Sequence, residues 1–81
     1  MRIRVLYFAS LARDVGKREA PLELPAGATV ADALRQLTSN HAAIRAFGDR
    51  LAIAVNSEYV GAEHLLRDGD ELALIPPVSG G

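Results

Sequence analysis

TVADALRQLTS, residues 29–39, is the one stretch of this chain whose pattern predicts a long helix. Thr29 is followed three residues later by the acid Asp32, which is the spacing of a capping box at a helix start. Apolar side chains then recur at helical spacing, at Val30, Ala33, Leu34 and Leu37. Because this period places them on one side of a helix, we expect a helix over residues 30–39 with an apolar face for packing.

The segment before this helix predicts a hairpin of two strands. Residues 2–8 alternate with the period of a strand. One face of this strand holds Ile3, Val5 and Tyr7, and the other face holds Arg2, Arg4, Leu6 and Phe8. A second strand is expected over residues 20–24, closed by the turn Pro25-Ala26-Gly27. Between the strands, Ser10 is placed to cap a short helical turn that Gly16 ends.

The segment after the helix predicts three more strands separated by turns. A strand is expected over residues 51–55, and the turn Asn56-Ser57-Glu58 leads into a very short strand at Tyr59-Val60. The turn Asp68-Gly69-Asp70 then precedes the last strand, residues 71–75, with glycine supplying the positive φ.

The order of these elements predicts an α+β domain. A weaker apolar stretch, residues 42–47, is assigned no element, so one long helix stands between two hairpin-like halves and covers one face of a mixed sheet. This is the connectivity of the β-grasp, or ubiquitin-like, fold, in which the first and last strands are central neighbours. The basic residues 1–18 and the acidic residues 58–81 then neutralise one another. We expect one domain over residues 1–77 and a flexible tail over residues 78–81.

Composition and charge exclude several classes of protein. The chain has 81 residues, no cysteine and a formal net charge of −1. It therefore has no thiolate for a metal site and no basic excess for binding nucleic acid or an anionic membrane. No apolar stretch approaches the roughly 20 residues of a membrane span, and residues 1–4 do not resemble the start of a signal peptide. We expect a cytoplasmic protein.

The sequence offers no pattern of metal ligands or catalytic side chains. His41 and His64 lack further ligands at metal spacing and are expected to be surface or capping residues. Asp68-Gly69-Asp70 lacks the rest of a calcium loop, and there is no Gly-rich phosphate loop. Lys17-Arg18 fits a solvated loop better than a contact for an anionic ligand or an acidic partner. We therefore expect this chain to bind no metal or cofactor.

The last residues, Pro76-Pro77-Val78-Ser79-Gly80-Gly81, predict a functional C-terminus. Neither proline can donate to a sheet ladder, so the pair separates the tail from the last strand. Gly80 and Gly81 have no Cβ, so they can lie extended in a narrow channel with the last carbonyl open to attack. The alternative is that a glycine tail simply frays, as most chain ends do.

A second candidate site is the sheet face that the helix leaves uncovered. If Ile3, Val5 and Tyr7 face the helix, the opposite face holds Leu6, Phe8, Ala73 and Ile75. A contiguous apolar patch is unusual on the surface of a monomer and is typical of a partner interface. Isolated surface hydrophobics are the alternative. Because the patch coincides with the start of the tail, we favour a partner interface.

Several motifs resemble the molybdopterin synthase small subunit, the sulfur carrier family of molybdenum-cofactor synthesis. The resemblance spans essentially the whole chain and rests on residues 5–13 (VLYFASLAR), 29–34 (TVADAL), 55–56 (VN), 68–71 (DGDE) and 75–81 (IPPVSGG). The ending over residues 75–81 is specific to this family. A diglycine after an Asp-Gly-Asp turn is shared with the sulfur carrier of the thiamine pathway.

The resemblance implies a sulfur-transfer chemistry at the C-terminus. An adenylating enzyme of the ubiquitin-activating type would use ATP to make an acyl-adenylate at Gly81. A persulfide donor would then convert Gly81 to a thiocarboxylate. The loaded tail would enter the large subunit of the synthase, which converts a cyclic pterin precursor to molybdopterin and forms a heterotetramer with its small subunits. This chain would then be a non-catalytic carrier, with the catalytic residues in the large subunit.

The resemblance also implies which residues form the site. Gly81 carries the sulfur and Gly80 provides access to it. Phe8 and Ile75 match apolar positions at the interface with the large subunit, although position 75 is often aromatic in the family. The expected interface is completed by Leu6, Tyr59, Pro76, Pro77, Val78 and Ser79.

Two other readings remain open. One is a sulfur carrier for thiamine synthesis or transfer-RNA thiolation, which the Phe8-Ala9-Ser10 segment and the chain length disfavour. The other is a ubiquitin-like protein modifier, whose diglycine would end in an isopeptide bond, or a passive binding module.

Overall fold

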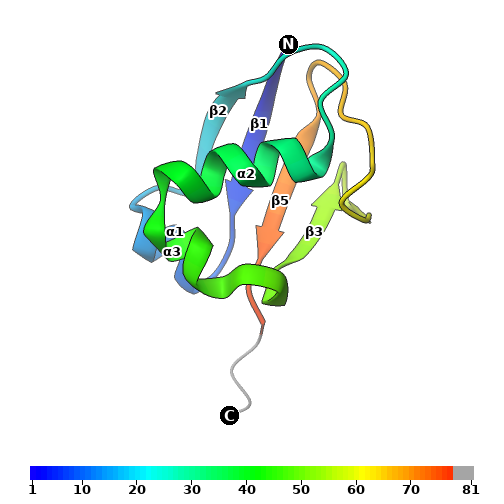
Figure 1. Ribbon diagram of the computed structural model, residues 1–81. Helices are drawn as coiled ribbons and strands as arrows, with labels where there is room; N and C mark the ends of the chain where they lie inside the picture. The colour runs from blue at the N-terminus through cyan, green and yellow to red at the C-terminus, as the bar shows by residue number, and fades with distance from the viewer. Residues whose placement is uncertain (78–81) are drawn as a thin grey trace.

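The computed structural model describes residues 1–77 as a five-stranded mixed sheet with one main helix lying across one face (Figure 1). The strands are β1 (Arg2–Tyr7), β2 (Glu19–Glu23), β3 (Ala52–Val55), β4 (Glu58–Tyr59) and β5 (Glu71–Ile75). Their order in the sheet is β2-β1-β5-β3-β4, and β1 pairs in parallel with β5 while the other pairs are antiparallel. This is the predicted β-grasp fold, with the first and last strands as central neighbours.

The main helix, α2 (Val30–Asn40), begins at the predicted capping box. The Asp32 backbone N–H donates to Thr29 Oγ1 at 3.3 Å, and the Thr29 backbone N–H donates to Asp32 Oδ2 at 2.9 Å. These bonds satisfy two of the donors that a helix start leaves free. The helix is one residue longer than predicted and buries Val30, Ala33 and Leu37 against the sheet.

The core lies between α2 and the two central strands. The predicted inward face of β1 and that of β5 are buried together, with Val5 opposite Leu72 and Tyr7 opposite Leu74. Burying a leucine or valine side chain fully contributes about 1.5–3 kcal/mol. No polar or charged side chain is buried in residues 1–77, so this aliphatic packing is the main source of stability.

The structure differs from the prediction in the cap of one short helix and in the presence of a second short helix and a 3₁₀ turn. Helix α1 (Ser10–Val15) was expected, but Ser10 is its first residue and not its cap, because Ala9 takes the N-cap position with φ 53°. Helix α3 (Ala42–Phe47) and the 3₁₀ turn η1 (Gly48–Arg50) were not predicted. An isolated helix of six residues is unstable in water, and α3 is held by burying Ile44 and by packing on α1 and α2. In residues 1–77 no helix has the length and apolar character that crossing a bilayer requires.

Strand boundaries differ from the prediction by one residue at several ends. Strand β1 stops at Tyr7, before Phe8, and β2 begins and ends one residue earlier than expected. Strand β3 begins at Ala52, and β4 starts at Glu58 and ends at Tyr59. Such shifts reflect where pairing with a neighbouring strand begins and ends, which the alternation of side chains does not specify.

The hairpin between β3 and β4 turns on two residues in the left-handed region. Val55 pairs with Glu58, and the two residues between them, Asn56 and Ser57, have φ of 51° and 74°. This is the conformation of a type I′ hairpin turn. Asn56 Nδ2 donates to Asp70 Oδ1 at 2.9 Å, and the Glu71 backbone N–H donates to Asn56 Oδ1 at 3.0 Å. The Asn56 side chain therefore joins this turn to the start of β5.

The Asp68-Gly69-Asp70 segment is a turn, as predicted. Gly69 has φ 85°. Asp68 Oδ1 accepts the Arg2 backbone N–H at 2.8 Å, and Asp70 Oδ2 accepts the Arg67 backbone N–H at 2.7 Å. Both carboxylates therefore accept backbone N–H groups, that of Asp68 from the first strand and that of Asp70 from within the turn.

The basic first strand is neutralised from both sides. Arg4 forms an ion pair with Glu71 of β5 and lies 3.9 Å from Glu19 of β2, and Arg2 pairs with Glu23 at 2.6 Å. The expected neutralisation between the first and last segments is therefore correct for Arg4 only. The acid that pairs with Arg2 belongs to β2, and Arg13, Lys17 and Arg18 form none of the ion pairs in residues 1–77.

We predict that Asp32→Asn lowers stability at neutral pH and has little effect in acid. Hydrogen bonds from the Thr29 backbone and side chain, and from Arg35, hold the pKa of Asp32 below its ordinary value. A lowered folded pKa contributes stability above the unfolded value, about 4, which is lost as the pH falls through the folded value. Urea unfolding of both proteins across this range measures the difference. A stability gap that stays constant with pH would contradict the assignment.

We predict that Ser57→Gly stabilises the fold by about 0.5–1 kcal/mol, because Asn-Gly is the preferred pair for a type I′ turn. For a domain of this size, 1 kcal/mol shifts the melting temperature by about 4–8 °C. Gly69→Ala is the opposite control. Gly69 has φ 85°, and a Cβ added there would meet no atom outside the neighbouring residues within 4 Å, so the expected loss of stability comes from the backbone conformation alone. A Ser57→Gly protein that melts below the parent would show that the turn does not require this conformation.

Candidate functional site

The uncovered face of the sheet carries an apolar patch at the end where β5 finishes. Its members, here called the outer-face patch, are Leu6, Phe8, Tyr59, Ala73 and Ile75. Phe8 is 44% exposed and Tyr59 is 75% exposed, which is unusual for large apolar side chains. The helices α2 and α3 lie across the opposite face of the sheet (Figure 1). The patch is therefore free of cover from residues 1–77.

The patch surrounds a hollow of about 160 Å³. Its floor is shallow because Ala54 of β3 stands directly opposite Ala73 of β5, so two small side chains lie at the centre of a ring of larger ones. Ser57 and Glu71 line the hollow at its polar side. The Glu71 carboxylate is paired with Arg4, so the hollow suits an apolar side chain from another molecule.

Strand pairing positions each large side chain of the patch. Leu6 lies beside Ala73 across the parallel pair, and Tyr59 lies opposite Ala54. Phe8 follows β1 directly, and its backbone N–H donates to the Leu74 carbonyl at 3.3 Å. The next residue, Ala9, has φ 53° and ψ −132°, a conformation that normally requires glycine. This sharp bend starts α1 while Phe8 remains on the outer face.

The predicted site residues divide into two groups. The structure brings Leu6, Phe8, Tyr59 and Ile75 around one hollow. Pro76 is buried and Pro77 is exposed where the chain leaves β5. Val78, Ser79, Gly80 and Gly81 lie outside the described residues, so the roles expected for them stay predictions.

Sequence reasoning missed three residues of the hollow: Ala54, Ser57 and Glu71. The alternation over residues 51–55 already placed two alanines on one face. It did not show which strand lies opposite them. Pairing that alternation with the alternation of β5 would have found the Ala54–Ala73 floor.

The two histidines lie apart from the patch. His41 stands between α2 and α3, and its ring meets the edge of Tyr7 at 6.1 Å between centroids and 71° between planes. Burial raises the pKa of Tyr7. His64 is exposed, and its carbonyl accepts the Val30 backbone N–H at 3.0 Å. Within residues 1–77 there is no group of three histidine or acidic side chains that could hold a metal ion.

Comparisons with known proteins identify relatives that cover nine tenths or more of the chain. The ThiS family model matches residues 5–81. The molybdopterin synthase sulfur carrier subunit of Chlamydomonas reinhardtii is 42% identical, with 100% of both chains covered. The small archaeal modifier protein 1 of Haloferax volcanii is 40% identical, with 91% of this chain and 94% of the relative covered. The crystal structure of SAMP1 from Haloferax volcanii superposes with a TM-score of 0.88 at 37% identity and covers 100% of both chains.

These relatives confirm the resemblance and the fold inferred from the sequence. They are of two kinds, carrier subunits of molybdopterin synthase and a small modifier, and both kinds are similar to this chain at comparable identity. The chain therefore belongs to the ThiS family, and it is a small β-grasp protein that acts as a sulfur carrier or as a small modifier.

Proposed function

We propose that this chain is the sulfur carrier subunit of a molybdopterin synthase. The observation that carries the proposal is the full-length similarity, at 42% identity, to a subunit with that role. The apolar patch at the end of β5 supports it, because a subunit needs a surface for its partner beside the segment that delivers the sulfur.

The proposed chemistry takes place at Gly81. Its carboxylate attacks the α-phosphorus of ATP in an adenylating enzyme, and pyrophosphate leaves. A carboxylate is a poor electrophile, whereas the acyl-adenylate can be attacked by the terminal sulfur of a persulfide, which displaces AMP and forms an acyl disulfide. A thiol of another molecule then attacks the donor's sulfur in this acyl disulfide, so that a new disulfide forms and the Gly81 thiocarboxylate leaves. The chain has no cysteine, so a persulfide on another protein supplies this sulfur. Gly80 has no side chain to obstruct either reaction.

The proposed partner is the large subunit of the synthase, which supplies the catalytic residues and holds the cyclic pterin precursor. The large subunit covers Leu6, Phe8, Tyr59 and Ile75, and Pro76 to Ser79 lead the tail into its active site. Each product needs two sulfurs and hence two loaded carriers. The assembly is a heterotetramer in the cytoplasm, and this chain itself holds no cofactor.

A second candidate function is that of a protein modifier. The similarity to the small archaeal modifier protein 1 of Haloferax volcanii, in sequence and in structure, favours it. In that case a lysine amine of a target protein attacks the same acyl-adenylate, and Gly81 ends in an isopeptide bond. The two functions share the activation step and differ in the nucleophile that follows.

We predict that the chain gains one sulfur in place of one oxygen when it is incubated with ATP, the adenylating enzyme, a persulfide donor and a thiol reductant. Intact-mass measurement detects this exchange. A chain that lacks Gly81 should not react, because the reacting carboxylate is displaced by one residue. An unchanged mass, under conditions that convert another carrier, would rule out the carrier function. Linkage of the chain to lysines, without the sulfur product, would favour the modifier.

We predict that Phe8→Ala weakens association with the large subunit by about tenfold or more, as truncation of a central aromatic side chain in an interface does. Leu65→Ala is the matched control, because Leu65 is 60% exposed and lies outside the patch. Calorimetric titration of each variant into the large subunit gives the affinities. Equal losses for both variants, or no loss for Phe8→Ala, would show that the patch is not the interface.

A further inference from the structure

A second and larger hollow adjoins the outer-face patch. It has a volume of about 830 Å³ and is open to solvent. It lies where β1 passes into α1 and where α1 passes into β2. Its lining combines an apolar floor with a charged rim and consists of Leu6, Tyr7, Phe8, Ala9, Ala12, Arg13, Gly16, Lys17, Arg18 and Glu19.

The rim is held by the backbone on both sides. Gly16 ends α1 with φ 91°, and its N–H donates to the Ala12 carbonyl at 2.9 Å. Two residues further on, the Arg18 carbonyl accepts the Tyr7 N–H at 2.8 Å, which extends the pairing of β1 with β2. The short segment from Gly16 to Arg18 is therefore anchored at both ends, and its side chains are presented from a defined turn.

The cations of this rim have no carboxylate partner within residues 1–77. The four ion pairs in that part of the chain use Arg2, Arg4 and Arg35 as their cations. Arg13, Lys17 and Arg18 are all exposed and form none of these pairs. The rim contains one acid, Glu19, so its formal charge is 3 − 1 = +2 in a chain whose net charge is −1.

The two hollows share a wall. Leu6 and Phe8 line both of them, so a protein that covers the outer-face patch also meets the cationic rim. Opposite charges across an interface favour association and fix its orientation. The complementary surface is therefore a segment that places acidic side chains beside an apolar one. Nucleic acid fits less well, because the cations form one small group on a chain with a negative net charge.

We propose that the hollow between α1 and β2 is a second contact for the partner on the outer-face patch, and that this partner presents an acidic segment to Arg13, Lys17 and Arg18. The proposal rests on the proposed function, in which the partner is the large subunit. It adds an electrostatic contact to the apolar one. The apolar contact supplies most of the affinity, and the cationic rim sets the orientation in which the partner docks.

The test measures how salt changes the affinity for the large subunit. In the wild type, association should weaken as salt rises, because counterions screen the pairs at the rim. The double variant Lys17→Glu, Arg18→Glu should bind about tenfold more weakly at low salt, given that each exposed pair contributes up to about 1 kcal/mol and reversal adds repulsion. Its affinity should approach that of the wild type at high salt. The conservative variant Lys17→Arg should bind as the wild type does.

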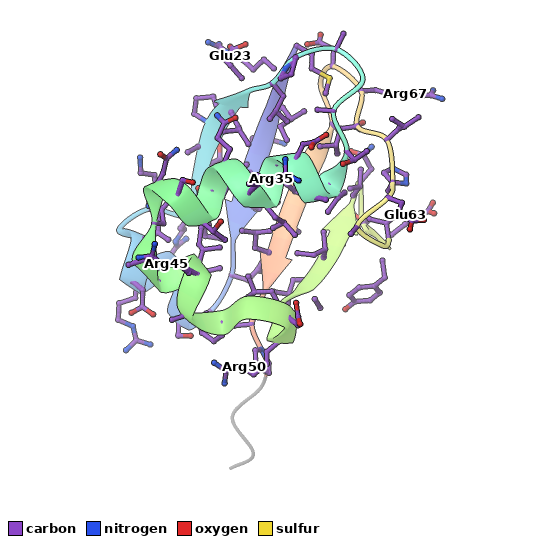
Figure 2. The ribbon with its side chains drawn as sticks, in the orientation of Figure 1. Glu23, Arg35, Arg45, Arg50, Glu63 and Arg67 are labelled. Carbon is purple, nitrogen blue, oxygen red and sulfur yellow. The ribbon has the colours of Figure 1, made fainter. Side chains whose placement is uncertain are left out.

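Arg67→Glu is the matched control for charge reversal. Arg67 is exposed and forms none of the ion pairs in residues 1–77, and Figure 2 shows it near the upper end of the molecule, away from α1 (Figure 1). We expect its affinity to stay within about twofold of the wild type, because its charge lies at the other end of the molecule and salt screens exposed charges that are far from the contact. Urea unfolding verifies that every variant remains folded.

Several outcomes would overturn the proposal. An unchanged affinity in the double variant, or an equal loss for Arg67→Glu, would leave the rim without a specific role. Tight binding of an RNA oligonucleotide that the double variant abolishes, with unchanged association with the large subunit, would assign the rim to nucleic acid. A wild-type chain that gains sulfur but does not bind the large subunit would contradict the proposed acceptor, and this inference with it. Measuring thiocarboxylate formation therefore distinguishes a failure of this inference from a failure of the proposed sulfur-carrier function.

Discussion

The parallel pairing of β1 with β5 is the constraint on which the rest of the structure depends. It brings together the first and last strands of the chain and fixes Leu6 beside Ala73 and Val5 beside Leu72. Because side chains alternate across a strand, one register sets both faces at once. Val5 and Leu72 are buried beneath α2, while Leu6 and Ala73 fall on the outer face. A slip of one residue would bury the patch and expose the core.

The outer-face patch differs from a second core because the side chains at its centre are small. Ala54 and Ala73 leave a hollow between Leu6, Phe8, Tyr59 and Ile75, and no helix in residues 1–77 fills it. The unusual backbone at Ala9 keeps Phe8 on this face at the point where the chain bends into α1. A conformation that costs about 1–3 kcal/mol persists only where the surrounding structure enforces it. The surrounding structure therefore holds Ala9 in this conformation, next to the surface proposed for the partner.

The charged side chains at the two ends of the sheet differ in whether they form ion pairs within residues 1–77. At the end of the sheet where β5 starts, Arg2 and Arg4 pair with acids of β2 and β5, and the Asp68-Gly69-Asp70 turn uses its carboxylates on the backbone. At the end where β5 finishes, the cations between α1 and β2 have no such partners within residues 1–77. That end also carries the apolar patch. The features expected of a binding surface therefore gather beside the segment that leads to Gly81.

Features set by neighbouring residues were predictable from the sequence. The capping box of Thr29 and Asp32, the alternation of β1, the Gly69 turn and the diglycine each depend on chemistry within a few residues. Helix α3, the bridge from Asn56 to Asp70, the Ala54–Ala73 floor and the lack of ion pairs within residues 1–77 for the cations of the second hollow emerged only in the tertiary structure. They depend on contacts between residues far apart in the chain, or on the absence of such contacts. The sequence thus determined the fold and the diglycine end, and tertiary packing decided the shape and charge of the surface of residues 1–77, because packing alone sets which side chains are covered.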